Sequence, residues 1–303
     1  MAIGKVIATA ASAFLAVTAT PAFAQDESPR SFTMQGSWSL DAGDDYCRLA
    51  AVFANGSDEI AFALERNRAE NFARLILVGD VIVPYRGTEE IGYRYQPENV
   101  QRTARFLRSE TADGRAFFNL GLIQFDEVPS GPPDLTAVYN REDELAFATG
   151  INALLLDEGL RQPIRIETGY MRGPMQALQA CTDDLLRVWG LDYQAHQTMT
   201  RRAAPVGPAY EWLASGTIGF GDFPLLGGGA NPVRVMVSAE GEPTACHVHW
   251  PSLDADTNES ICEQILENGE FTPALDAEGN PIASYWTVDP IFGLTRPFGG
   301  RRR

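Results

Sequence analysis

The chain has 303 residues, enough for two ordinary domains, and a formal net charge of −16 at pH 7 from 40 acidic and 24 basic residues. Lys5 is its only lysine, so almost all of the positive charge is arginine. An acidic chain without a basic stripe is not typical of proteins that bind nucleic acid or anionic membrane surfaces.

The N-terminal residues 1–24 have the features of a cleaved secretory signal peptide. Residues 1–5 form a short basic region, residues 6–19 are apolar, and Ala22-Phe23-Ala24 matches an A-x-A cleavage site. The apolar run is shorter than the roughly 20 residues that span a bilayer. We therefore expect export by the Sec pathway, cleavage after Ala24, and a soluble periplasmic protein without a transmembrane anchor.

Residues 33–200 are predicted to form a β-rich α+β domain, after a polar segment, 25–32, that we expect to be disordered. Apolar and β-branched runs between turn signals predict strands at residues 46–53, 59–64, 72–78, 91–95, 103–108, 116–123 and 164–167. Apolar residues at the helical period predict helices at residues 143–156 and 174–189.

The rest of the chain is predicted to hold a second, smaller domain. Residues 201–232 are expected to form a linker and approach segment, residues 233–295 the domain itself, and residues 296–303 a flexible tail. Within the domain, alternating polar and apolar residues predict a strand at 233–237 and a second strand through Cys246, followed by a helix at 253–268 and a last strand at 282–288.

This order of elements and turns resembles the TonB C-terminal domain family over roughly residues 205–295. The residues that carry the resemblance are Val233-x-Val235-x-Val237, Gly241, Ser252-Leu253, Phe271-x-Pro273-Ala274, Gly279-x-Pro281 and Tyr285-Trp286. The arrangement as a whole also resembles exported proteins of alphaproteobacteria that carry such a C-terminal module.

The resemblance implies a small ββαβ fold that binds a segment of an outer-membrane or periplasmic protein by strand addition. On this chain it implies an edge strand formed by Ile282, Ser284, Tyr285, Trp286 and Val288. An energy transducer of this family also needs an uncleaved membrane anchor and a long proline-rich spacer. We expect neither here, so the resemblance implies the fold and segment binding and not energy transduction.

The chain has four cysteines, an even number, which in an exported protein favours disulfides. Cys246 is expected to face the core of the second domain and to pair with Cys262 on the following helix. Cys47 on an early strand and Cys181 on a helix form the other expected pair. The alternative for Cys47 and Cys181 is a pair of buried free thiols.

His247 and His249 alternate with Cys246, Val248 and Trp250, so the two imidazoles are expected on the outer face of the strand, open to water or to a partner. Such an H-x-H pair is also found in zinc and copper sites, and this alternative stays open, although we predict no metal ion or cofactor. The acidic pairs Asp44-Asp45 and Asp183-Asp184 are interpreted as solvated carboxylates.

The sequence contains no recognisable hydrolase motif, because G-x-S-x-G, S-x-x-K and H-E-x-x-H are all absent. This absence favours a non-enzymatic protein without catalytic residues, which binds a protein segment in an envelope transport or adaptor role. The alternative is an exported enzyme or metal-binding protein with an unrecognised site in residues 33–200.

Overall fold

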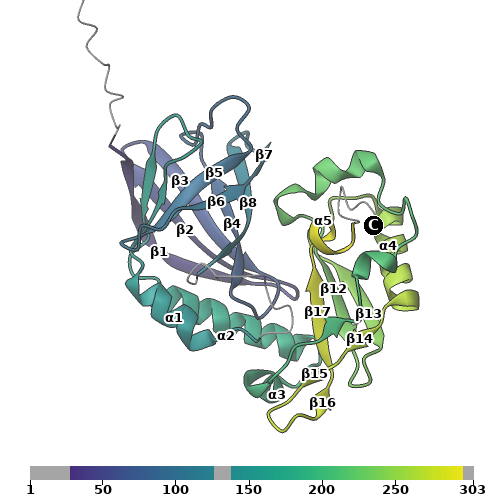
Figure 1. Ribbon diagram of the computed structural model, residues 1–303. Coiled ribbons are helices and arrows are strands. Elements are labelled where there is room, and N and C mark those ends of the chain that lie inside the picture. The colour runs from purple at the N-terminus through teal and green to yellow at the C-terminus, as the bar shows by residue number, and fades with distance from the viewer. Residues whose placement is uncertain (1–27, 126–137, 296–303) are drawn as a thin grey trace, which may run out of the picture.

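The computed structural model describes residues 28–125 and 138–295 (Figure 1). These residues form two hydrophobic cores, one from Phe32 to Trp189 and the other from Ala203 to Leu294. We call the two parts the barrel unit and the sheet unit. The expected signal peptide and tail lie outside the described residues. In the described part, no helix has both the length and the apolar character needed to cross a membrane.

The barrel unit is built on one ten-stranded sheet. Its strands are β1 (Arg30–Ala42), β2 (Cys47–Asn55), β3 (Asp58–Arg66), β4 (Phe72–Val78), β5 (Glu90–Gln96), β6 (Arg102–Arg105), β7 (Leu107–Glu110), β8 (Ala116–Gln124), β9 (Ala153–Leu156) and β10 (Ile164–Glu167). Their spatial order is β6-β5-β9-β10-β1-β2-β3-β4-β8-β7, and only the β1–β10 pair is parallel. The end strands β6 and β7 are separated in the chain by Phe106 alone, so the sheet curls into a nearly closed barrel (Figure 1).

Alternation of side chains along each strand fills the inside of the barrel. In β2 and β3 every second residue points inward, including Phe53 and Phe62, which are fully or almost fully buried. Trp38 packs edge-on against both rings at centroid distances of 5.9 and 5.5 Å. The void beside Phe62 and Tyr95 measures only about 10 Å³, too little for a small-molecule ligand. This part of the barrel is therefore a packed core.

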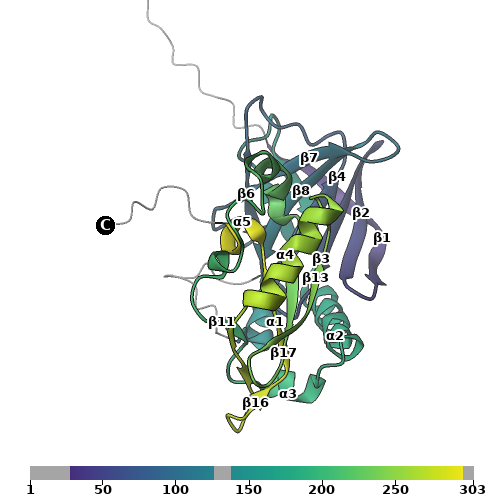
Figure 2. The same ribbon diagram turned by 90° about the vertical axis from the view of Figure 1, so that its right-hand side faces the viewer.

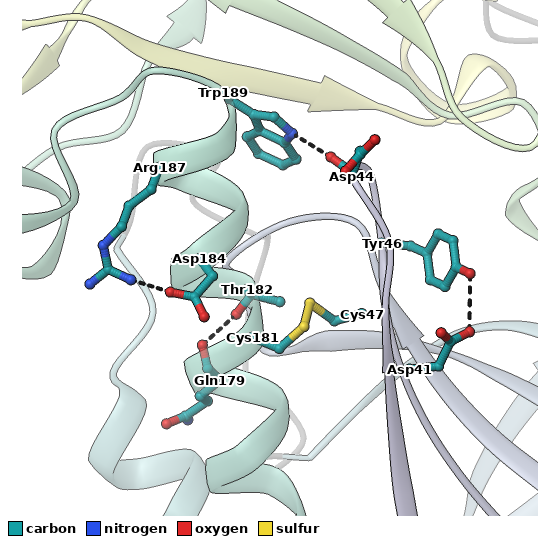
Figure 3. The surroundings of a disulfide bond; sticks show 10 residues. All are labelled: Asp41, Asp44, Tyr46, Cys47, Gln179, Cys181, Thr182, Asp184, Arg187 and Trp189. Atoms are coloured by element: carbon teal, nitrogen blue, oxygen red, sulfur yellow. Dashed lines mark hydrogen bonds and ion pairs between the residues drawn. A yellow bond between two sulfur atoms is a disulfide. The ribbon is translucent and has the colours of Figure 1, made fainter.

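Three helices continue the barrel unit: α1 (Arg141–Gly150), α2 (Arg172–Val188) and α3 (Tyr193–Thr198). A disulfide between Cys47 of β2 and Cys181 of α2 fastens α2 to the barrel wall, as Figure 3 shows. Deeper in the unit, Arg66 and Glu144 form a buried ion pair, and the Gln179 amide donates a hydrogen bond of 2.6 Å to Glu144.

The sheet unit has a three-stranded antiparallel sheet in the order β13-β12-β17, with a long helix over one face (Figure 2). Its larger elements are β12 (Val233–Val237), β13 (Pro243–Val248), α4 (Ala255–Asn268) and β17 (Ser284–Val288). The short ones are β11 (Ala204–Pro205), β14 (Phe271–Thr272), β15 (Ala274–Leu275), β16 (Pro281–Ile282), α5 (Pro290–Gly293) and the 3₁₀-helices η1 (Ala209–Glu211) and η2 (Phe220–Gly229).

The core of the sheet unit lies between α4 and the sheet. Val233, Val235 and Val237 face Ile261 and Ile265 across this core. Cys246 of β13 and Cys262 of α4 form a disulfide. These are the pairings expected from the sequence, here and in the barrel unit. The described residues thus form a mixed α/β, strand-rich molecule with one large, nearly closed sheet and five α-helices.

Several expected elements differ from the structure. Strand β1 begins at Arg30, inside the segment expected to be disordered, because its first residues pair in parallel with β10. The helix expected over residues 143–156 stops at Gly150, and residues 153–156 become β9, which lies between β5 and β10. Apolar residues alone do not distinguish a short buried strand from a helix end.

Two further differences concern the sheet unit. The segment expected to be a linker contains β11, η1 and η2, and its Trp212 and Leu226 are buried in the second core. The expected last strand is divided, because Ile282 belongs to β16 and pairs with Ala274 of β15, whereas β17 pairs with β12.

Candidate functional site

The barrel unit and the sheet unit meet on the face of the three-stranded sheet that is opposite α4. Along β12 and β13, the side chains of Arg234 and His247 alternate with core residues and therefore point to this face. Hydrogen bonds join five residues of the barrel unit to this face or to the segments beside it. These residues are Asp45, Glu65, Arg68, Ala69 and Glu70. We call this contact the joint.

Asp45, two residues before the start of β2, is the centre of the joint. Its carboxylate lies 2.8 Å from Nε2 of His247 and 2.7 Å from Nδ1 of His249, and it also accepts a hydrogen bond from Arg234. Burial alone would raise the pKa of Asp45. The hydrogen bonds from the two histidines and the charge of Arg234 outweigh it, so the pKa of Asp45 lies well below its usual value of 3.8.

His249 is buried and is held between two carboxylates. Its Nδ1 faces Asp45, and its Nε2 lies 3.2 Å from Oε1 of Glu65. A neutral imidazole can donate from one nitrogen only, whereas the imidazolium ion donates from both. Burial would lower the pKa of His249, but the hydrogen bonds to Asp45 and Glu65 outweigh it and raise the pKa above 6.5.

Glu65 of β3 links this cluster to the barrel wall. Arg48 is its direct cross-strand neighbour, and the Arg48 guanidinium lies 2.6 Å from Glu65. Burial would raise the pKa of Glu65, but the hydrogen bonds from His249 and Arg48 hold it below its usual value of 4.5. Two carboxylates thus face two guanidinium groups and the ring of His249, with the exposed His247 at the rim.

This arrangement is not suited to bind a metal ion. Both nitrogens of His249 already face carboxylates, and Arg48 and Arg234 supply the positive charge that a cation would bring. Among residues 28–125 and 138–295, no group of three or more His, Cys, Asp or Glu side chains is placed to hold a metal ion. The cluster binds one part of the protein to another.

The third histidine, His196 of α3, also lies at the joint. Its Nδ1 lies 2.7 Å from the carbonyl oxygen of Asp192, its Nε2 lies 3.0 Å from Oγ of Ser284 in β17, and its ring is stacked on Tyr285. Burial lowers the pKa of His196 below 6.5. A serine–histidine contact of this kind is found in hydrolases. Here both residues are buried and the adjoining cavity measures about 40 Å³, so a substrate has no access.

A second set of polar contacts covers β17. The Tyr285 hydroxyl accepts a hydrogen bond from Ala69 N at 2.9 Å, and Thr287 accepts one from Arg68 at 2.6 Å. Glu70 forms an ion pair with Arg202, which precedes the sheet unit. The contact between the two units is therefore polar over much of its area, and Arg68, Glu70 and Tyr285 are buried in it.

The three-stranded sheet has two edges with different surroundings. At one edge, β17 is covered on both faces, and Ser284, Tyr285, Trp286 and Val288 are all less than 9% exposed. At the other edge lies β13, in which Thr244, Ala245 and His247 are exposed. Ile282, expected in the binding strand, lies in β16.

The histidine pair was expected to be open to water or to a separate partner, and for His249 this is wrong. Alternation correctly separates the two histidines from Cys246, but the barrel unit covers this face. His247 remains about half exposed, whereas His249 is buried. Their acidic partners, Asp45 and Glu65, are 184 to 204 residues away in the chain, which no local pattern reveals.

Three other interpretations from the sequence need correction. Asp45 is not a solvated carboxylate, because it is bonded to Arg234 and to both histidines. Asp183 is not a solvated carboxylate, because it is buried in an ion pair of 2.7 Å with Arg141. Trp250 was expected in the core beside Cys246. It lies just beyond β13 with a φ of 50°, and its ring stacks on the guanidinium of Arg74. The left-handed backbone at Trp250 ends the alternation of the strand, so its ring no longer follows Val248.

Comparison with protein-family models, with curated proteins and with solved structures found no match to this chain. Its function is therefore inferred from its own residues, of which the joint and the exposed edge strand β13 are the most informative.

Proposed function

We propose that this protein is a non-enzymatic binding protein of the periplasm, which takes up an extended segment of another envelope protein by strand addition. The observation that carries this proposal is the exposed edge strand β13, with α4 behind it. An edge strand offers unpaired N–H and C=O groups to which a partner chain can bond.

The order of elements supports a TonB-like ββαβ fold for residues 233–295, as the sequence motifs imply. Strands β12 and β13, helix α4 and strand β17 follow one another in the chain, as that fold requires. The two disulfides support an exported protein. In this proposal the partner is a segment of an outer-membrane or periplasmic protein, as the resemblance implies.

The resemblance implies binding at the last strand, β17, but we place the site at β13. Ser284 and Tyr285 of β17 are only 2% and 4% exposed, so a segment could not reach them without separating the two units. A segment can reach the exposed residues of β13 without any separation of the two units.

Charge near β13 favours a basic segment. Glu259 and Glu263 are exposed on α4 within one turn of Cys262, whose disulfide holds this part of the helix to β13. Gln264 and Asn268, which lie on another side of the helix, contact residues 212–217 instead. A segment that alternates lysine or arginine with β-forming residues would suit this edge.

The test uses a short peptide of alternating lysine and threonine, with a glutamate–threonine peptide as its matched control. Amide chemical shifts in the full-length protein should move along β13 on addition of the lysine peptide only. Because His249 N bonds to Pro232 O, alternate residues in the regular part of β13 direct their N–H to β12 and leave that of Val248 at the open edge.

Val248→Pro removes this N–H and should abolish binding, whereas Val248→Ala keeps it and should bind normally. Val248 packs partly against the core of the sheet unit and both variants change that packing, so the comparison isolates the backbone donor. Shifts along β17 would instead favour the edge implied by the resemblance. Absence of shifts in either strand would contradict the proposal.

A further inference from the structure

The protein has three histidines, and all three lie at the joint between the barrel unit and the sheet unit. Histidine is the side chain whose ordinary pKa lies closest to neutral pH. The stability of the contact between the two units is therefore linked to the protonation of these histidines.

His249 at one end of the joint is held as a cation. Asp45 faces it from the segment before β2 and Glu65 faces it from β3. Arg48 of β2, Arg234 of β12 and His247 of β13 bond to the same two carboxylates. Loss of the proton from His249 would leave one of the two carboxylates without its donor in a buried site.

His196 at the other end is held as a neutral ring. Its ring contacts the backbone oxygen of Asp192, the hydroxyl of Ser284 and the face of Tyr285. The charge of the Asp192 carboxylate favours a proton on the ring, but burial outweighs it. Arg141 of α1 and Asp183 of α2 line the same small cavity, but they are paired with each other. No carboxylate among the described residues bonds to the His196 ring, so a proton added to it would be a buried charge without an ionic partner.

We propose that these two histidines form a pH-dependent latch between the units, with His249 holding the joint only when protonated and His196 holding it only when neutral. The contact between the units is most stable at a pH at which His249 is protonated and His196 is neutral. It weakens at higher pH, where His249 loses its proton, and at lower pH, where His196 gains one. Loosening uncovers Tyr285 and Thr287 of β17, which Ala69 and Arg68 cover in the closed joint.

The two histidines act in opposite directions. For His249, whose pKa is raised in the folded protein, the stabilisation is fully present below the ordinary value of 6.5 and is lost as the pH rises through the raised pKa. For His196, whose pKa is lowered, it is fully present above 6.5 and is lost as the pH falls toward the lowered pKa. Both contributions are therefore nearly complete near pH 6.5.

Hydrogen–deuterium exchange of the full-length, disulfide-intact protein, read by mass spectrometry and corrected for intrinsic rates, tests the latch. Segments 66–71 and 284–288 report on the joint, and β4 serves as an internal control in the barrel core. Protection of the two joint segments should be greatest near pH 6.5 and fall on either side. The alkaline fall should approach tenfold for each unit by which the pKa of His249 is raised.

Three variants assign the two sides of the profile. His249→Gln should remove the alkaline fall and keep the acid one, and His196→Gln should do the reverse. Glu267→Gln, at an exposed position of α4 on the opposite side of the sheet from the joint, should keep both. If His249→Gln does not fold, Glu65→Gln retains the ring and should shift the alkaline fall to lower pH.

Protection of the joint that does not vary between about pH 5 and pH 9, while β4 behaves normally, would overturn the latch. A profile that is unchanged in both His249→Gln and His196→Gln would also overturn it, because the response would then belong to other groups.

Discussion

At the residue scale, the charge of His249 is set by what lies on each side of its ring. Asp45 and Glu65 approach different nitrogens, so both N–H groups have acceptors only when the ring is protonated. The same residue on an exposed strand would titrate as an ordinary histidine. The neighbours favour the protonated form of a side chain that the strand pattern alone would leave facing solvent.

Asp45→Asn tests this dependence, since it removes the charge at the centre of the cluster and keeps the size of the side chain. The pKa of His249 should fall, and the protein should lose about 1–2 kcal/mol near pH 6, because Asp45 is only partly buried. An NMR titration of the histidine ring protons and urea unfolding measure the two effects. Asp44→Asn, at the exposed neighbouring position, is the control, and an unchanged pKa of His249 in Asp45→Asn would contradict the expectation.

At the scale of elements, the boundary between α1 and β9 shows how local signals divide a segment. Asn140 caps α1 by accepting hydrogen bonds from Glu142 N and Asp143 N. The helix ends where Ile151 takes an extended backbone. The following leucines form β9 because a place between β5 and β10 satisfies their backbone groups on both sides.

Asn140→Ala should destabilise the protein by about 1 kcal/mol, because two N–H groups of the first turn lose their acceptor. Asn140→Asp keeps an acceptor at the same position and should have a stability close to that of the natural protein. Urea unfolding of the three proteins at one pH gives the comparison. Equal losses in the two variants would show that the cap has no effect of its own.

At the scale of the whole molecule, each hydrophobic core has its own disulfide, and the contact between the units is largely polar. Cys47–Cys181 closes a separation of 134 residues within the barrel unit, and Cys246–Cys262 closes one of 16 within the sheet unit. Neither bond crosses the joint, so the two units are held together by non-covalent contacts and by the chain that connects them.

Replacing each cysteine pair by alanine should separate the two contributions. From the loop lengths, loss of Cys47–Cys181 should cost about 5 kcal/mol and loss of Cys246–Cys262 about 3 kcal/mol, because the longer loop restricts the unfolded chain more. Urea unfolding of the two double variants measures both values. A greater cost for the shorter loop would indicate that strain or residual structure outweighs loop closure.

The sequence by itself determined most local structure. Apolar runs between turn signals and period-two patterns predicted strands that overlap β2 to β8, β10, β12, β13 and β17, and helical periods predicted segments that overlap α1, α2 and α4. The direction of side chains along a strand also separated Cys246 from His247 and His249. These features are set by steric alternation within a few residues, so they can be read without knowing the rest of the fold.

Only the tertiary structure decided how the sheet closes and what lies over the histidines. Closure of the barrel depends on pairings such as β1 with β10, which join strands far apart in the chain. The partners of His249 come from the segment before β2 and from β3, and they change it from a water-facing residue into a buried cation. Such contacts depend on the packing of whole units against each other, and no pattern in a short stretch of residues carries that information.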